Sequence, residues 1–179
     1  MPEALIIVDF QNDFCPGGAL AVAGGDTIAQ RMNELAASGR YDLVVATRDW
    51  HPADHGSFAE QGGPWPVHCV QGSPGAQLHP ALDQSKLDAV LDKGSDPATE
   101  GYSGFEGTAL AGLLREHGID RVTVVGLATD YCVKNTALDA LREGFEVDID
   151  TDAMRGVNVE PGDDQRAIEE MRAAGARVS

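Results

Sequence analysis

Apolar positions along this 179-residue chain alternate between two patterns. Short, nearly unbroken runs rich in Val, Ile and Leu predict β-strands. These runs span residues 4–10, 42–49, 87–94, 121–128 and 145–153, and the final GARVS has the character of a short sixth strand. The first, second and fourth runs are apolar at almost every position, which is typical of strands buried on both faces of a parallel sheet.

Segments with helical spacing separate these runs. Between residues 26 and 38, Ile28, Met32 and Leu35 recur on one face, with Asp26 placed to cap the helix and Gly39 to end it. Similar spacing predicts helices over residues 108–117, 132–143 and 163–174. Strands and helices therefore alternate, which predicts an α/β fold with an open, mostly parallel six-stranded sheet and helices on both faces.

The region at about residues 50–86 interrupts this alternation. It is rich in Gly, Pro, His and Ser and has little periodicity. A loop of this length inside a compact domain usually carries a function. No linker or internal repeat divides the rest of the chain, so we expect a single domain over residues 1–179 with this loop as an insertion.

The chain is strongly acidic. Its 29 Asp and Glu against 13 Lys and Arg give a net charge of −16, which repels phosphate backbones and anionic lipid. We therefore expect no nucleic-acid and no membrane partner, and the acidity itself favours solubility or a salt-rich cytoplasm. No apolar run approaches the ~20 residues of a membrane span, and no secretory signal is recognisable, so a cytoplasmic location is expected.

Polar residues stand where four of the predicted strands end. Asp9 closes the first strand, Asp49 the second and Lys93 the third, and Cys132 follows the fourth. Ligands of open α/β sheets bind beyond these carboxyl ends. One such acid is as often a turn former or a helix cap, but four residues together favour a shared site.

Cys132 stands at the predicted start of a helix, where free backbone N–H groups and the helix dipole favour a thiolate nucleophile. A buried structural thiol is an equally ordinary role for such a residue. Cys15 and Cys69 lack this setting, and we expect both to be structural. Asp9 and Lys93 are the candidates to activate Cys132, the carboxylate by taking the thiol proton and the ammonium by holding the resulting charges together.

The loop after the second strand is rich in histidine. The segments DWHPADHGSF and WPVHC contain Asp49, His51, His55 and His68, which offer one carboxylate and up to three imidazoles to a divalent metal. Each histidine alone is more often an ordinary polar residue, but this density favours a metal site. Zinc, iron and manganese all suit these ligands.

Six ordered segments carry a resemblance to a known family. They are ALIIVDFQNDFCPGGALAV, ATRDWHPADHGSF, WPVHCVQGSPGAQLHP, KGSDPATEGYSGFEGTAL, VVGLATDYCVKNTALDA and MRAAGARV. Together they span essentially the whole chain, which resembles the nicotinamidases, or pyrazinamidases, of the isochorismatase-like cysteine hydrolases. The resemblance implies a three-layer α/β/α fold. It also implies hydrolysis of nicotinamide and pyrazinamide through a cysteine thioester, as part of NAD salvage.

The resemblance also assigns roles to residues around the reacting amide. It implies a catalytic triad of Asp9, Lys93 and Cys132. It further implies an oxyanion hole built from the N–H groups of Ala128 and Cys132, next to a cis peptide bond between Leu127 and Ala128.

Metal and substrate contacts follow from the same resemblance. It implies a metal at Asp49, His51 and His68, and His55 matches a histidine that binds metal in some members. The aromatic residues that match a pyridine-binding pocket are Phe14, Trp65 and Tyr102, with Tyr131 standing where some relatives carry histidine.

Three alternatives compete with this interpretation. A superfamily amidase acting on a carbamoyl or ureido substrate would generally lack the metal histidines. An iron oxygenase with two histidines and a carboxylate normally has a β-barrel rather than an α/β pattern. A binding protein on the same fold would not need Asp9, Lys93 and Cys132 together. We expect nicotinamide as the small-molecule partner, and a monomer or small homo-oligomer.

Overall fold

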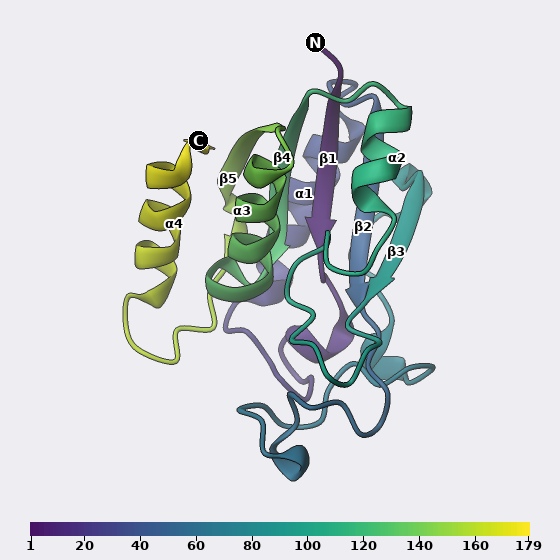
Figure 1. Ribbon diagram of the computed structural model, residues 1–179, viewed down its shortest axis with the longest axis vertical. Coiled ribbons are helices and arrows are strands. Elements are labelled where there is room, and N and C mark those ends of the chain that lie inside the picture. Colours follow the sequence, from purple (N-terminus) through teal and green to yellow (C-terminus); the bar gives the residue numbers. More distant parts are fainter.

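A six-stranded sheet forms the centre of the protein in the computed structural model, which describes residues 1–179 (Figure 1). The strands are β1 (Glu3–Val8), β2 (Leu43–Asp49), β3 (Ala89–Lys93), β4 (Arg121–Leu127), β5 (Glu146–Arg155) and β6 (Arg177–Val178). Their order across the sheet is β3-β2-β1-β4-β5-β6, and all neighbouring strands are parallel. The predicted fold class is confirmed, with a sheet that is wholly parallel.

Four α-helices cover the two faces of this sheet. They are α1 (Ala29–Ala37), α2 (Leu110–Glu116), α3 (Lys134–Arg142) and α4 (Asp163–Ala174). Helix α1 lies behind the sheet in Figure 1, whereas α2 and α3 lie in front of it. Helices on both faces are therefore confirmed. None of the helices combines the length and the apolar character that crossing a membrane would require.

The core is split by the sheet into two buried clusters, which explains the unbroken apolar runs. Alternate residues of β1 point to opposite faces: Ile6 and Val8 pack in the cluster that includes α2, α3 and α4, whereas Leu5 and Ile7 pack with α1. Because both faces of β1 are covered by helices, no position in the strand can be polar without an internal partner.

The predicted cap of the first helix is wrong. Gly24, with a left-handed φ of 68°, starts a 3-10 turn over Gly25–Ile28, so α1 begins only at Ala29 and Asp26 lies inside the preceding turn. The predicted end is correct, because Gly39 adopts a positive φ of 77° directly after the helix and its C-cap Ser38. The error shows that acidic residues before an apolar run fit a 3-10 turn as well as an N-cap.

The connection between β2 and β3 contains short 3-10 turns and isolated bridges but no α-helix. It lies beneath the carboxyl ends of the central strands in Figure 1. Backbone bonds hold it there, because His51 N donates to Cys69 O at 2.9 Å and Gln71 N donates to His51 O at 2.8 Å. The strand order reverses at β1, because β2 and β3 are added on one side of it and β4 to β6 on the other. Open α/β sheets form a ligand-binding crevice at such a point.

The excess negative charge predicts stability that rises with salt. A net charge of −16 leaves many carboxylates without a basic partner, and their mutual repulsion weakens as salt shortens the screening length. We expect the unfolding midpoint to rise by about 3 °C or more between ~0.05 M and ~1 M KCl, measured by calorimetry. A falling midpoint would mean that surface ion pairs such as Arg40 with Asp148, at 3.0 Å, outweigh the repulsion.

Candidate active site

The ammonium of Lys93 lies at the centre of the site. Parallel pairing places Lys93, the last residue of β3, opposite Asp49, the last residue of β2. Its Nζ atom lies 2.6 Å from Asp49 Oδ1, 2.8 Å from Asp9 Oδ2 and 3.5 Å from Cys132 Sγ, and it donates to Gly101 O at 2.7 Å. The side chain is fully buried. The structure therefore brings the four strand-end residues of the sequence analysis into one cluster.

Asp9 is placed to exchange a proton. It follows β1 with a left-handed φ of 49°, and its Oδ1 accepts a hydrogen bond of 2.9 Å from Thr47 Oγ1. Its Oδ2 pairs with Lys93 but makes no well-aligned hydrogen bond. Burial raises the pKa of Asp9 to about 6, although the nearby ammonium opposes this rise. A carboxylate with a raised pKa is a better proton acceptor than an ordinary one.

Cys132 lies in a π-helical turn, Thr129–Val133, between β4 and α3. The helix proper begins at Lys134, slightly later than predicted. Burial raises the pKa of Cys132 well above that of an ordinary thiol, and the ammonium of Lys93 only partly offsets this because Asp9 repels a thiolate. A helix end contributes only ~0.3–1 kcal/mol, so it does not ionise a thiol in this setting. A thiol in this setting needs a base to become a nucleophile, which is the role predicted for Asp9.

Asp49, His51 and His68 form a compact candidate metal centre, with one ligand atom from each within 4.8 Å of the others. Asp49 Oδ2 faces the Nε2 atoms of His51 at 3.4 Å and of His68 at 3.9 Å. The opposite ring nitrogens are engaged by backbone carbonyls: His51 Nδ1 lies 2.7 Å from Gly94 O, and His68 Nδ1 lies 2.8 Å from Pro66 O. This leaves both Nε2 atoms free to bind. One carboxylate and two oriented imidazoles fit a divalent metal.

The charge of Asp49 supports the same interpretation. Burial alone would raise the pKa of this carboxyl, but Lys93 and His51 outweigh burial and hold the pKa below its usual range. Asp49 therefore stays ionised and bridges two cation positions, with Oδ1 on the ammonium and Oδ2 toward the histidines.

His55 lies next to this group but outside the compact trio. Its ring lies against that of His51 at a centroid distance of 3.9 Å with a tilt of 34°, and its Nδ1 lies 2.7 Å from Ser57 Oγ. Its Nε2 is buried without a hydrogen-bond partner. Burial lowers the pKa of His55 to about 4, so the ring is neutral and can donate a lone pair. That His55 is a metal ligand stays a prediction.

An apolar cavity opens onto Cys132, Asp49 and His68. All four aromatic residues expected around a ring substrate line it, namely Phe14, Trp65, Tyr102 and Tyr131. Leu20, Val157 and Ala128 complete the apolar lining. Trp65 Nε1 donates to the Tyr102 hydroxyl at 3.1 Å, and the Trp65 and Tyr131 rings meet edge to face. Aromatic side chains therefore form much of the wall of the cavity beside the Cys132 sulfur.

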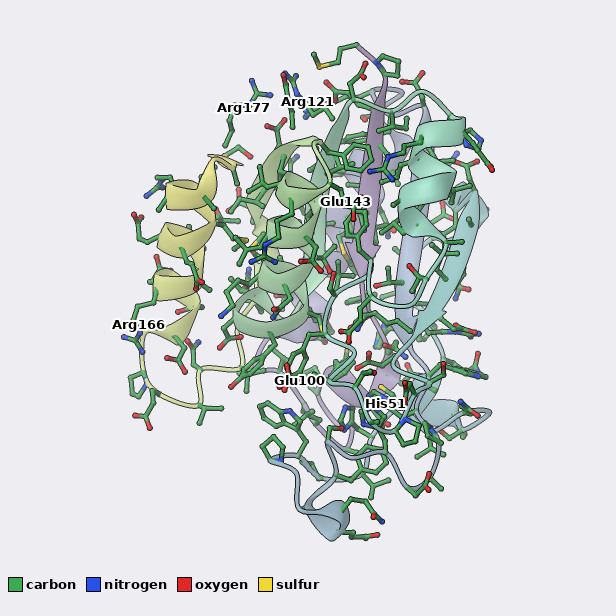
Figure 2. All side chains as sticks on the ribbon, viewed as in Figure 1. His51, Glu100, Arg121, Glu143, Arg166 and Arg177 are labelled. Atoms are coloured by element: carbon green, nitrogen blue, oxygen red, sulfur yellow. The ribbon has the colours of Figure 1, made fainter.

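A second depression lies far from this chemistry. It is polar, open to solvent and lined by Arg31, Arg40 and Arg177. Figure 2 shows Arg177 at the end of the molecule opposite His51. Because no nucleophile or metal-ligating trio lies there, the smaller apolar cavity is the candidate substrate pocket.

The peptide bond between Leu127 and Ala128 is cis, as the sequence resemblance implied. Ala128 lines the substrate cavity together with Cys132. The assignment of their two N–H groups as an oxyanion hole stays a prediction.

Sequence reasoning missed two residues that hold Asp9 and Asp49 in place. Thr47 Oγ1 donates to Asp9, and the fully buried Gln11 bonds both backbone groups of Asp49, donating to its carbonyl at 2.8 Å and accepting from its N–H at 2.9 Å. The signal for Thr47 was present, because it is a polar residue that directly follows the four apolar positions at the start of β2.

The wholly parallel sheet and the cluster at its carboxyl edge define an α/β protein with a buried cysteine as the candidate nucleophile. The isochorismatase domain matches residues 3–179 of the chain. The chain therefore belongs to the isochorismatase family.

Named relatives narrow the comparison. The chain is 49% identical over 200 residues to a nicotinamidase of Escherichia coli (strain K12), covering 99% of this chain and 94% of that protein. It is similar to the crystal structure of a pyrazinamidase of Pyrococcus horikoshii in complex with zinc, with a TM-score of 0.91, 49% identity and coverage of 100% and 99%. It is also similar to PnC1 from L. infantum in complex with nicotinate, with a TM-score of 0.94, 41% identity and coverage of 99% and 92%.

Proposed function

We propose that this protein hydrolyses nicotinamide and pyrazinamide to the corresponding acid and ammonia, and so acts in NAD salvage. The observation that carries the proposal is the convergence of Asp9, Lys93 and Cys132 beside an aromatic cavity and a metal-ligating trio. The nicotinamidase and pyrazinamidase relatives support the choice of a ring carboxamide.

The first half of the reaction forms a thioester. Asp9 takes the proton of the Cys132 thiol, and Lys93, 3.5 Å from the sulfur, stabilises the thiolate. The sulfur attacks the carboxamide carbon, a C–S bond forms, and the carbonyl electron pair moves onto oxygen. The N–H groups of Ala128 and Cys132 would hold this oxyanion.

The second half releases the products. Asp9 returns its proton to the carboxamide nitrogen, the C–N bond breaks, and ammonia leaves. Water then attacks the thioester carbon with Asp9 again acting as the base, which yields the carboxylic acid and restores the thiol. Because Asp9 must both accept and donate a proton, a pKa of about 6 suits its two tasks better than the usual carboxyl value.

We propose that residues 1–179 form a single domain and that its loop insertion, at about residues 50–86, helps to orient the substrate through a bound metal. Asp49, His51 and His68 would hold one divalent metal, with His55 as a further candidate ligand. When bound, such a metal would act as a Lewis acid toward the ring nitrogen of the substrate. The aromatic side chains of the cavity would stack on the ring, and the carboxamide would then face Cys132.

The test of this function is ammonia release from nicotinamide by the purified protein, with pyrazinamide and a ureido acid assayed in parallel. We expect turnover of both ring amides and little release from the ureido compound. Activity confined to the ureido compound would instead support the related superfamily amidases and overturn the proposal.

Metal removal should reduce activity reversibly. Because the metal held by the trio would orient the substrate and would not attack it, we expect removal of the metal by a chelator to raise KM and to lower kcat/KM by about tenfold or more. Adding back zinc, manganese or ferrous iron singly should restore turnover, and metal content should be measured in the same samples. Full activity in a sample shown to be free of metal would contradict this role.

A further inference from the structure

The carboxylate of Asp130 ties the segment after β5 to the turn that carries Cys132. Its Oδ1 accepts a hydrogen bond of 2.9 Å from Val157 N, and its Oδ2 accepts one of 2.8 Å from Asn158 N. Asp130 is only 6% exposed and lies in the same π-helical turn as Cys132. One buried side chain thus clamps two successive N–H groups of a segment that belongs to no helix or strand.

Further contacts fix the shape of the clamped segment. Asn158 adopts a left-handed φ of 54°, and its Oδ1 accepts from Asp164 N in the first turn of α4 at 2.9 Å. Gly156 approaches that helix so closely that a Cβ atom there would lie 2.5 Å from Asp164 Cβ. Between these two anchors, the side chain of Val157 lines the substrate cavity together with Cys132.

Asp130 does not line the cavity itself. It lines a separate outer depression together with Lys134 and Glu170, whereas Val157 contributes to the inner apolar wall. Asp130 can therefore influence the substrate by two routes, through the backbone of Val157 or through the turn that it shares with Tyr131 and Cys132. Hydrogen bonds from N–H groups to a buried carboxylate are stronger than neutral ones, so the clamp can hold this wall in one position.

We propose that Asp130 is a positioning residue that fixes Val157 as a wall of the ring pocket and thereby restricts which aromatic amides reach Cys132. The inference rests on the proposed hydrolysis of ring carboxamides. The substrate class that the wall selects is a single six-membered ring, because a displaced Val157 would leave room for a fused bicyclic amide.

Asp130→Ala tests the clamp. We expect KM for nicotinamide to rise about tenfold, because two charge-assisted hydrogen bonds are lost, while kcat stays within about threefold. The preference for nicotinamide over quinoline-3-carboxamide, expressed as the ratio of kcat/KM, should fall by about tenfold. Trypsin cleavage after Arg155, followed by mass spectrometry, should become faster as the segment loosens.

Three further variants separate positioning from general damage. Asp130→Asn keeps one acceptor oxygen and the shape of the side chain, so intermediate values are expected. Val157→Ala shortens the side chain that forms the wall and leaves the hydrogen bonds of the clamp intact. It should weaken the substrate preference and leave the rate of trypsin cleavage unchanged. Glu170→Gln removes an acid from the same outer depression, where it pairs with Lys134 at 3.5 Å, and should match wild type throughout.

Wild-type KM, substrate preference and trypsin rate in Asp130→Asn, or in a folded Asp130→Ala, would overturn the inference. A loss confined to kcat would also overturn it, since Asp130 would then act on the nucleophile turn alone. If Asp130→Ala does not fold, the Asn variant decides the question by the same criteria. Failure of the proposed function is distinguishable, because wild type would then release no ammonia from nicotinamide in the same assay.

Discussion

Replacing Cys132 with alanine is expected to reduce kcat for nicotinamide by about 10⁴-fold or more, because the attacking atom itself is removed. The structure offers no replacement thiol, since Cys15 and Cys69 are buried away from the cavity lining and burial raises the pKa of both thiols. The measurement is ammonia release at saturating substrate, with intact-mass analysis for a trapped acyl adduct in wild type.

Metal content provides the internal check on this variant. The sulfur is not part of the trio formed by Asp49, His51 and His68, so Cys132→Ala should bind as much metal as wild type. Cys15→Ala is the matched control, because it removes another buried thiol and should keep nearly full activity. Turnover by Cys132→Ala at the wild-type rate would show that the sulfur is not the nucleophile, whatever the metal content.

The parts of the structure that the sequence predicts well are those with a repeated physical signal. The strand β1 is apolar at every position after Glu3 because helices cover both of its faces, and this pattern is readable without any tertiary information. Asp9, Asp49 and Lys93 were placed in one site for a similarly general reason. Parallel strands end at one edge of the sheet, so polar residues at the ends of adjacent strands lie close together.

The parts that could not be predicted depend on contacts between irregular segments. Asp130 accepts hydrogen bonds from the backbone N–H groups of Val157 and Asn158, which lie 27 and 28 positions further along the chain. They belong to a loop whose path follows from no periodic pattern. Gln11 holds Asp49, 38 positions away, in the same manner. Such side chains look like ordinary turn residues in the sequence, because their role depends on which backbone groups the fold leaves without partners.

The second large effect is expected when Lys93 is replaced by methionine. Lys93 is buried between Asp9 and Asp49, at 2.8 and 2.6 Å, and its pKa lies well above the ordinary lysine value because the two carboxylates outweigh the effect of burial. Methionine has a similar length but leaves both acids buried without a cation. Removing one partner from a buried ion cluster costs about 3–5 kcal/mol of unfolding free energy. We therefore expect a large loss of stability as well as of activity.

The measurement is denaturant unfolding of Lys93→Met and wild type at several pH values, with metal removed from both by a chelator. It gives the loss of unfolding free energy and the direction in which that loss changes with pH. Without the ammonium, burial in the folded state raises the pKa of at least one of the two carboxyls above its unfolded value of about 4. The stability that this raised pKa contributes is fully present at pH values below the unfolded pKa and is lost as the pH rises through the folded pKa. The deficit relative to wild type should therefore be larger at pH 7 than at pH 5. Lys86→Met, at an exposed position, is the matched control and should change stability by less than about 0.5 kcal/mol. Equal denaturation midpoints for Lys93→Met and wild type would mean that the buried ion cluster does not form.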